Sequence, residues 1–95
     1  MKVILLPSAD KKLDEAVDYY NDQLNGLGEQ FYKEFISLIE FIQIIPQGWQ
    51  KVGKHTRRCL FKRFPYLILY IVEYNAIIIT SIAHQHRHPD SYKKY

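Results

Sequence analysis

Residues 57–84 read RRCLFKRFPYLILYIVEYNAIIITSIAH, and this stretch decides the fold. It is rich in β-branched and aromatic residues, which favour strands. Two short breaks divide it, one at Phe64-Pro65 and one at Glu73–Asn75, and both have the composition of tight turns. The three apolar segments around these breaks therefore predict three consecutive strands, which links this short would pair as an antiparallel meander.

The sequence before this stretch has a helical period. A helix is expected from Ser8, which would be its N-cap, because apolar residues then recur at helical spacing between acidic ones: Leu13, Ala16, Val17, Tyr20 and Leu24. After the NGLG break at 25–28, a second apolar series predicts another helix that ends before Pro46. Two helices with so short a link should form an antiparallel hairpin. The apolar run at residues 2–6 predicts a strand ahead of them.

These patterns predict a single α+β domain over residues 1–95, with the element order βααβββ. Its small, twisted, antiparallel-rich sheet would carry the helical hairpin on one face. Residues 46–55 are expected to form a loop or an irregular edge. Because helices would cover only one face, the other face is left open, and the strand TRRCLFKRF at 56–64 would make that face basic and rich in aromatic residues.

Charge is distributed unevenly along the chain. Residues 1–50 hold four Lys or Arg and eight Asp or Glu, a net charge of −4, whereas residues 51–95 hold nine and two, a net charge of +7. No acidic residue occurs from Phe41 to Val72. This asymmetry favours an anionic partner for the second half, either nucleic acid or an acidic protein, and the alternative is a solvated basic face.

Cysteine content and hydropathy indicate the compartment. The single Cys59 has no internal disulfide partner, which is typical of a reducing environment. The first apolar run is too short for a signal peptide, and no run approaches the ~18 apolar residues of a membrane span. A cytoplasmic location without membrane association is therefore expected.

An ordered set of short motifs resembles a known family. In the second half these motifs are Arg57-Arg58, Phe64-Pro65-Tyr66, Tyr70, Ala83-His84, Arg87, Pro89 and Tyr92. In the first half they are residues 9–20 as a helix, then Leu27-Gly28, Phe31 and Pro46. Together they resemble the RelE/ParE superfamily, the growth-arresting toxins of bacterial type II toxin–antitoxin systems, some of which act in plasmid stabilization. The resemblance spans nearly the whole chain.

The resemblance implies a cognate antitoxin as partner, in a hetero-oligomer, and two different activities. RelE-like members are ribosome-dependent endoribonucleases that cut messenger RNA without a metal ion or other cofactor. ParE-like members have no chemistry of their own and inhibit DNA gyrase by binding it. A degenerate, non-toxic member is a third alternative. Fold alone does not separate these activities, so the residues of the site must.

RNA cleavage by the 2′-hydroxyl needs a base, cations on the phosphate and an acid for the leaving oxygen. By resemblance to the nucleases, Arg58 and Arg87 would hold the phosphate, His86 would transfer a proton and Tyr92 would position the substrate. Further basic residues would bind the nucleic acid along the same surface: Lys54, Arg57, Lys62 and Arg63.

The main departure from the nuclease pattern is Leu67. It follows Tyr66, at the position where the nucleases carry their phosphate-binding Arg. Loss of a charge-assisted phosphate contact at the reacting centre costs orders of magnitude in rate. Leu67 therefore favours the gyrase inhibitor, whereas Arg58, His86 and Tyr92 favour the nuclease.

Three histidines, His84, His86 and His88, alternate along the end of the last predicted strand. A span of four residues along a strand is about 13 Å, whereas metal ligands lie about 2 Å from the ion. No shared metal site is therefore expected. The alternatives are polar residues at an exposed strand end, or one histidine that acts on phosphate or contacts a partner.

Several other conspicuous residues are interpreted as packing residues. Tyr66 and Tyr70 are expected to pack in the sheet rather than stack on bases. Trp49 is expected to fold its loop onto the core. Cys59 is expected to be a small buried hydrophobe, since no base pattern beside it would make it a nucleophile.

Overall fold

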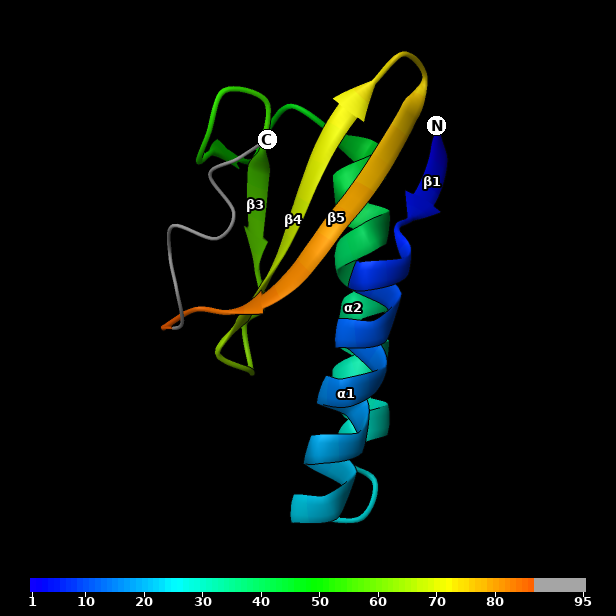
Figure 1. The fold of residues 1–95 in the computed structure, drawn as a ribbon, viewed down its shortest axis with the longest axis vertical. Coiled ribbons are helices and arrows are strands. Elements are labelled where there is room, and N and C mark those ends of the chain that lie inside the picture. The colour runs from blue at the N-terminus through cyan, green and yellow to red at the C-terminus, as the bar shows by residue number, and fades with distance from the viewer. Residues whose placement is uncertain (87–95) are drawn as a thin grey trace.

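The computed structural model describes residues 1–86 and shows a two-layer α+β fold (Figure 1). Its elements in chain order are β1 (Lys2–Leu5), α1 (Pro7–Gln23), α2 (Leu27–Ile44), β2 (Gln50–Lys51), β3 (Arg57–Leu60), β4 (Tyr66–Glu73) and β5 (Ala76–His84). The predicted N-terminal strand, helical hairpin and meander are all confirmed.

The five strands form one mixed sheet in the order β1-β5-β4-β3-β2. β3, β4 and β5 are the predicted antiparallel meander, and β1 joins its far edge parallel to β5. The two helices between β1 and the meander provide the long connection that such a placement requires. The segment expected to be a loop or irregular edge contains β2, whose two residues pair with Arg58 and Arg57.

Two predicted boundaries differ from the structure. Helix α1 begins at Pro7 with Leu6 as its N-cap, so Ser8 lies within the first turn. Proline suits this first position because its missing N–H has no partner there in any helix. The Ser8 hydroxyl instead donates to the carbonyl of Thr80, 3.5 Å away in β5. Strand β3 ends at Leu60 instead of continuing to Phe64.

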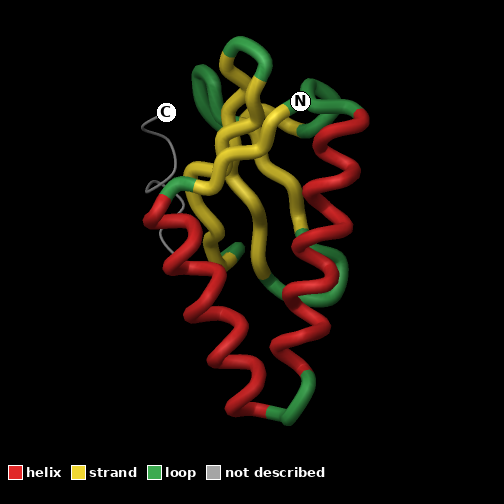
Figure 2. Tube along the Cα trace, turned by 90° about the vertical axis from the view of Figure 1, so that its right-hand side faces the viewer, coloured by secondary structure: helices red, strands yellow, loops and turns green. Residues whose placement is uncertain are grey.

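The helical hairpin packs on one face of the sheet and extends beyond its end (Figures 1 and 2). Gly28 permits the close contact between the helices, because a Cβ there would overlap the backbone carbonyl of Val17. The Asn21 side-chain oxygen accepts the Gly28 N–H at 2.8 Å, which satisfies a backbone donor in the first turn of α2. The link between the helices is thus fixed by backbone contact as well as by apolar packing.

Aromatic side chains fill the core between the layers. The Phe31 ring of α2 stacks on Phe61 with centroids 4.6 Å apart, and it meets Phe64 and Tyr66 edge-on at 5.0 and 5.2 Å. Tyr20 of α1 closes the cluster at 5.5 Å from Phe31. Phe61 follows Cys59 on the helix side of β3 and donates its backbone N–H to the carbonyl of Tyr66, and Phe64 joins the same cluster from the link to β4.

Among residues 1–86, neither helix combines the length and the apolar character that crossing a membrane would require.

Candidate interaction surface on the open face of the sheet

The face of the sheet opposite the helices has an apolar centre. On β4, Ile68 and Tyr70 belong to the core beneath the helices, so the alternation of a strand directs Leu67 and Leu69 to the other face. Leu67 and Leu69 are nevertheless only 2% and 1% exposed. On β3, Leu60 lies directly opposite Leu67 on this face.

The expectation of an aromatic-rich open face is therefore wrong, whereas Arg58 does lie on this face. The aromatic residues of the meander, Phe61, Phe64, Tyr66 and Tyr70, all pack against the core on the helix side. This side buries the most apolar area, and large rings gain the most stability from burial. Tyr66 and Tyr70 thus pack in the sheet, as predicted, and Trp49 packs against the core as expected.

Arg58 is the basic residue of β3 on the open face, opposite Leu69 of β4. Its Nε and Nη2 groups both donate to the side-chain oxygen of Gln50 across the strands, at 3.1 and 2.7 Å. Two of its five N–H donors are thereby used within the protein. Arg58 is positioned by a neighbouring strand rather than presented freely to a phosphate.

The predicted nucleic-acid-binding residues do not gather beside Arg58. Arg57 alternates to the helix side of β3 and donates to the carbonyl of Trp49 at 2.6 Å. Lys62 and Arg63 lie in the link between β3 and β4, at the surface of α2. Lys54 is exposed in the turn between β2 and β3.

A carboxylate of α2 holds the link between β3 and β4. The Glu34 oxygens accept the backbone N–H groups of Lys62 and Arg63 at 2.6 and 3.3 Å. The Arg63 guanidinium donates to the side-chain oxygen of Gln30 at 2.5 Å. These contacts give Arg63 a structural role on the helix side of the sheet.

His84 is the last residue of β5, and His86 follows in the turn after it. His84 pairs with Tyr66 across the strands, and their rings are 5.3 Å apart in an edge contact. Since Tyr66 faces the helices, His84 leaves the sheet on that side, opposite to Arg58. The Nδ1 atom of His84 accepts the backbone N–H of His86 at 3.2 Å.

The sheet register separates the predicted catalytic residues further. Arg58 is level with Leu69 and Ser81, and His84 is three residues, ~10 Å, beyond that level. His86 follows in the turn after β5. The structure therefore does not bring His86 and Arg58 together.

Three further predicted residues lie outside the described residues: Arg87, His88 and Tyr92. Up to residue 86, no three metal-ligating side chains converge.

Two buried titratable groups are held in their neutral forms. Burial raises the pKa of the Cys59 thiol to about 12, with a further contribution from the Glu34 carboxylate. Cys59 is fully buried in the core, as expected for a packing residue. Burial also raises the pKa of Tyr70, although the Arg57 guanidinium partly opposes the effect. The Tyr70 hydroxyl donates to the carbonyl of Pro46 at 2.6 Å, which fastens the loop after α2 to the sheet.

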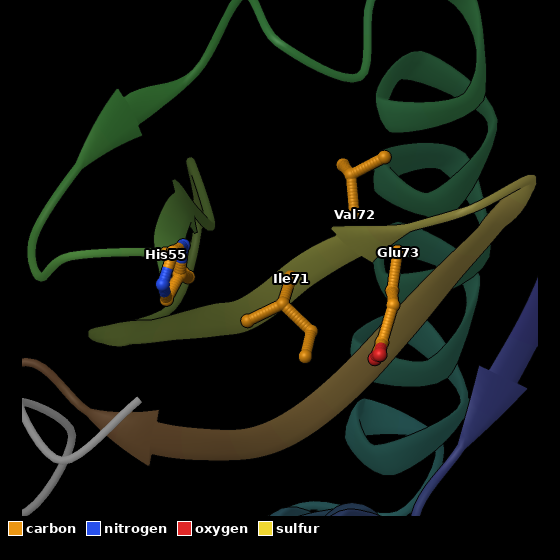
Figure 3. A pocket seen from close by; sticks show the side chains of 4 residues that line it. All are labelled: His55, Ile71, Val72 and Glu73. Carbon is orange, nitrogen blue, oxygen red and sulfur yellow. The ribbon is translucent and has the colours of Figure 1, made fainter.

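A groove of about 390 Å³ lies beside the turn between β4 and β5, and His55, Ile71, Val72 and Glu73 line it (Figure 3). Sequence reasoning did not identify this groove. The one sequence feature that could have indicated it is Glu73, the single acidic residue between Glu40 and Asp90. His55 belongs to a turn remote in sequence, and only the pairing of β3 with β4 places it there.

Among the described residues, the open face thus has a closely packed apolar centre rather than a set of groups for phosphate chemistry. A small mixed sheet with a helical hairpin on one face, and a surface of this kind on the other, defines the fold class of RelE/ParE-type toxins.

Sequence comparison identifies the family within this fold class. Residues 3–89 match the family described as ParE toxin of type II toxin-antitoxin system, parDE. The chain therefore belongs to the ParE toxin family.

A solved structure is similar in fold. It is described as a chromosomal ParDE TA system from P. aeruginosa, and the match has a TM-score of 0.79 at 18% sequence identity. The match covers 88% of this chain and 95% of the other. No curated protein matches the sequence.

Proposed function

We propose that this toxin acts by binding, as a ParE-like inhibitor of DNA gyrase, and that it does not cut RNA. The observation that carries the proposal is Leu67. It occupies the position of the nucleases' phosphate-binding Arg and is 2% exposed. A phosphate cannot contact a cation there, and the neighbouring Leu60, which is 43% exposed, suits contact with a protein partner.

The positions of Arg58 and His86, the predicted catalytic residues that the structure describes, support the same conclusion. The Arg58 guanidinium is hydrogen-bonded to Gln50. His84 and His86 lie at the end of β5, beyond the level of Arg58. A nuclease mechanism on this surface would require phosphate-binding and proton-transferring groups around one reacting phosphate. The RelE-like endoribonuclease remains the alternative that the experiment must distinguish.

Induced expression separates the two activities. For a gyrase inhibitor, DNA replication should stop first, with a DNA-damage response and intact messenger RNA. For a RelE-like nuclease, translation should stop first, and mapped RNA 5′ ends should show cuts phased with the ribosome. Cuts that disappear in both Arg58→Ala and His86→Ala would overturn the proposal.

The same variants give a graded test. If Arg58 serves an interface, Arg58→Ala should weaken toxicity several-fold, as single interface truncations do, rather than abolish it. His86→Ala should behave similarly or have no effect. Both proteins should keep the wild-type circular dichroism spectrum, which shows that any loss of toxicity reflects lost contacts rather than unfolding.

We also propose that the cognate antitoxin covers apolar surface at the end of α2. Phe41, Ile44 and Ile45 are each more than half exposed there. The net charge of +7 over residues 51–95 suits an acidic antitoxin segment. Association should therefore be several-fold faster at low salt than at high salt. An association rate that salt does not change would contradict electrostatic steering by this half of the chain.

A further inference from the structure

Two buried leucines of β4 lie on the face of the sheet that the helices leave open. Leu67 and Leu69 are 2% and 1% exposed, yet neither belongs to the core beneath the helices. Both helices pack on the other face (Figures 1 and 2). A large side chain stands out from its sheet, so neighbouring strands shield its flanks but leave its tip open to water. The burial of both leucines therefore requires a cover over the open face.

The described neighbours of the two leucines do not provide this cover. Four residues lie opposite them across the strands: Leu60, Ala83, Arg58 and Ser81. All four are themselves partly exposed. The alanine and the serine are too short to reach over a leucine, and the Arg58 guanidinium is hydrogen-bonded to Gln50 on β2, on the side away from β4.

No described helix or strand lies over the leucines either, since both helices are on the other face and all five strands belong to the one sheet. The turn that holds His55 lies beside Ile71, further along β4. Because the burial is that of a single chain, a second copy or a separate partner is not needed to explain it. The rest of the chain is residues 87–95, RHPDSYKKY.

The described end of the chain is well placed for this segment to reach the leucines. A turn follows β5 directly. In it, the Gln85 N–H donates to the carbonyl of Pro65 at 2.8 Å, and its side-chain amide donates to the carbonyl of Tyr66 at 3.1 Å. These bonds hold the exit of the chain next to Leu67. Leu69 is three residues, about 10 Å, beyond the level of Tyr66, whereas nine extended residues reach roughly 30 Å.

The composition of the segment suits a cover over apolar side chains. Its proline and its two tyrosines, Tyr92 and Tyr95, provide apolar surface. A tyrosine can bury its ring while its hydroxyl reaches water, so it fits a thin layer at the surface of a protein. Three Lys or Arg and one Asp give the segment a net charge of +2, and these charged groups would remain in solvent.

We propose that residues 87–95 fold back over the open face of the sheet and bury Leu67 and Leu69 beneath their tyrosine rings. The segment carries its basic groups onto the face that already holds Arg58. A target that approaches this face therefore meets the C-terminal segment rather than the leucines. This arrangement does not depend on whether the target is gyrase or messenger RNA.

The test uses the full chain with 13C-labelled leucine methyl groups. In NMR spectra, the methyl protons of Leu67 and Leu69 should show NOEs to ring protons of Tyr92 or Tyr95. A soluble gadolinium chelate should relax these methyl groups several-fold less than those of Leu60, which is 43% exposed. NOEs to residues 1–86 alone would overturn the proposal, and so would equal relaxation of the three leucines.

A double variant identifies the covering segment. Tyr92→Ser/Tyr95→Ser should increase the relaxation of the Leu67 and Leu69 methyl groups several-fold, because it removes both rings. Tyr74→Ser is the matched control, since Tyr74 is 98% exposed in the turn after β4, and it should leave both leucines protected. Full protection of the leucines in the double variant would contradict the proposal. If the double variant fails to fold, the NOEs of the wild-type chain still decide the question.

Discussion

Leu60 and Leu67 are direct partners across β3 and β4, yet Leu60 is 43% exposed and Leu67 is 2% exposed. They share one face of the sheet, and the position of the strand makes the difference. β4 has neighbours on both sides, whereas β2 pairs only with the first two residues of β3, so Leu60 lies on a free edge. Position 67, where the nucleases carry their phosphate-binding Arg, thus lies in the buried centre of this face.

This contrast gives a matched pair of substitutions. Leu67→Arg should lower the free energy of unfolding by about 3–4 kcal/mol, because it buries a charge without a partner. Leu60→Arg should change it by less than about 0.5 kcal/mol, because the new side chain reaches water. Guanidinium-induced unfolding measures both. A stable Leu67→Arg protein that cleaves RNA would contradict the assignment of this face to protein binding.

Glu34 should stabilise the link between β3 and β4. Glu34→Ala leaves the Lys62 and Arg63 amides without their acceptor, so a loss of about 1–2 kcal/mol in unfolding free energy is expected. These two amides should also exchange with solvent faster than those of β4. Glu40→Ala is the control, since Glu40 is an exposed carboxylate on the same helix. Unchanged exchange of both amides in Glu34→Ala would show that the carboxylate contributes nothing.

Tyr74 should destabilise the turn that carries it. Its φ of 55° lies in the left-handed region, and its side chain is 98% exposed, so no packing offsets the strain. Tyr74→Asn and Tyr74→Gly should each raise the unfolding free energy by about 0.5–1 kcal/mol. Tyr74→Phe should leave it unchanged. If Tyr74→Gly gains stability but loses toxicity, the ring contacts the target.

Alkaline pH should destabilise the fold through Cys59. The folded thiol has a pKa of about 12 instead of 9.0, so between these values the unfolded chain has lost a proton that the folded chain still binds. The unfolding free energy should therefore fall as pH rises through this range, by at most about 1.4 kcal/mol per pH unit from this group. The raised pKa of Tyr70 acts in the same direction above pH 10.

Unfolding titrations from pH 8 to 11 test this dependence. Cys59→Ala should be less stable at pH 8, because it leaves a cavity, but its stability should fall less steeply with pH. Tyr70→Phe should remove the second contribution together with the hydrogen bond to Pro46. Parallel curves for the wild type and Cys59→Ala would contradict the role of the thiol.

Local patterns in the sequence predicted the elements well. The β-branched runs of residues 66–84 and the breaks at Pro65 and Tyr74 mark β4, β5 and their turns. The helical period ended the second helix before Pro46, as observed. The errors fall where tertiary contacts override local preference. Ser8 bonds to Thr80 instead of capping a helix, and Phe64 packs edge-on against Phe31 from the link between β3 and β4 instead of extending the strand.

The candidate site was predicted less well, for a geometric reason. Sequence shows that Arg58, His86 and the other basic residues exist, but not which face of the sheet each one leaves. A single position along a strand moves a side chain to the opposite face, so adjacent Arg57 and Arg58 diverge. The groove of His55 and Glu73 joins residues 18 positions apart, and no local pattern connects them.

The order of the elements and the amphipathic helices follow from residues close together in the chain, and the charge of the second half and the likeness to RelE/ParE toxins follow from residue types and their order. The facing of the aromatic residues towards the helices, the pairing of Arg58 with Gln50 and the burial of Leu67 became evident only in three dimensions. These features depend on strand register and layer packing, which bring distant residues together and have no signature in a single segment.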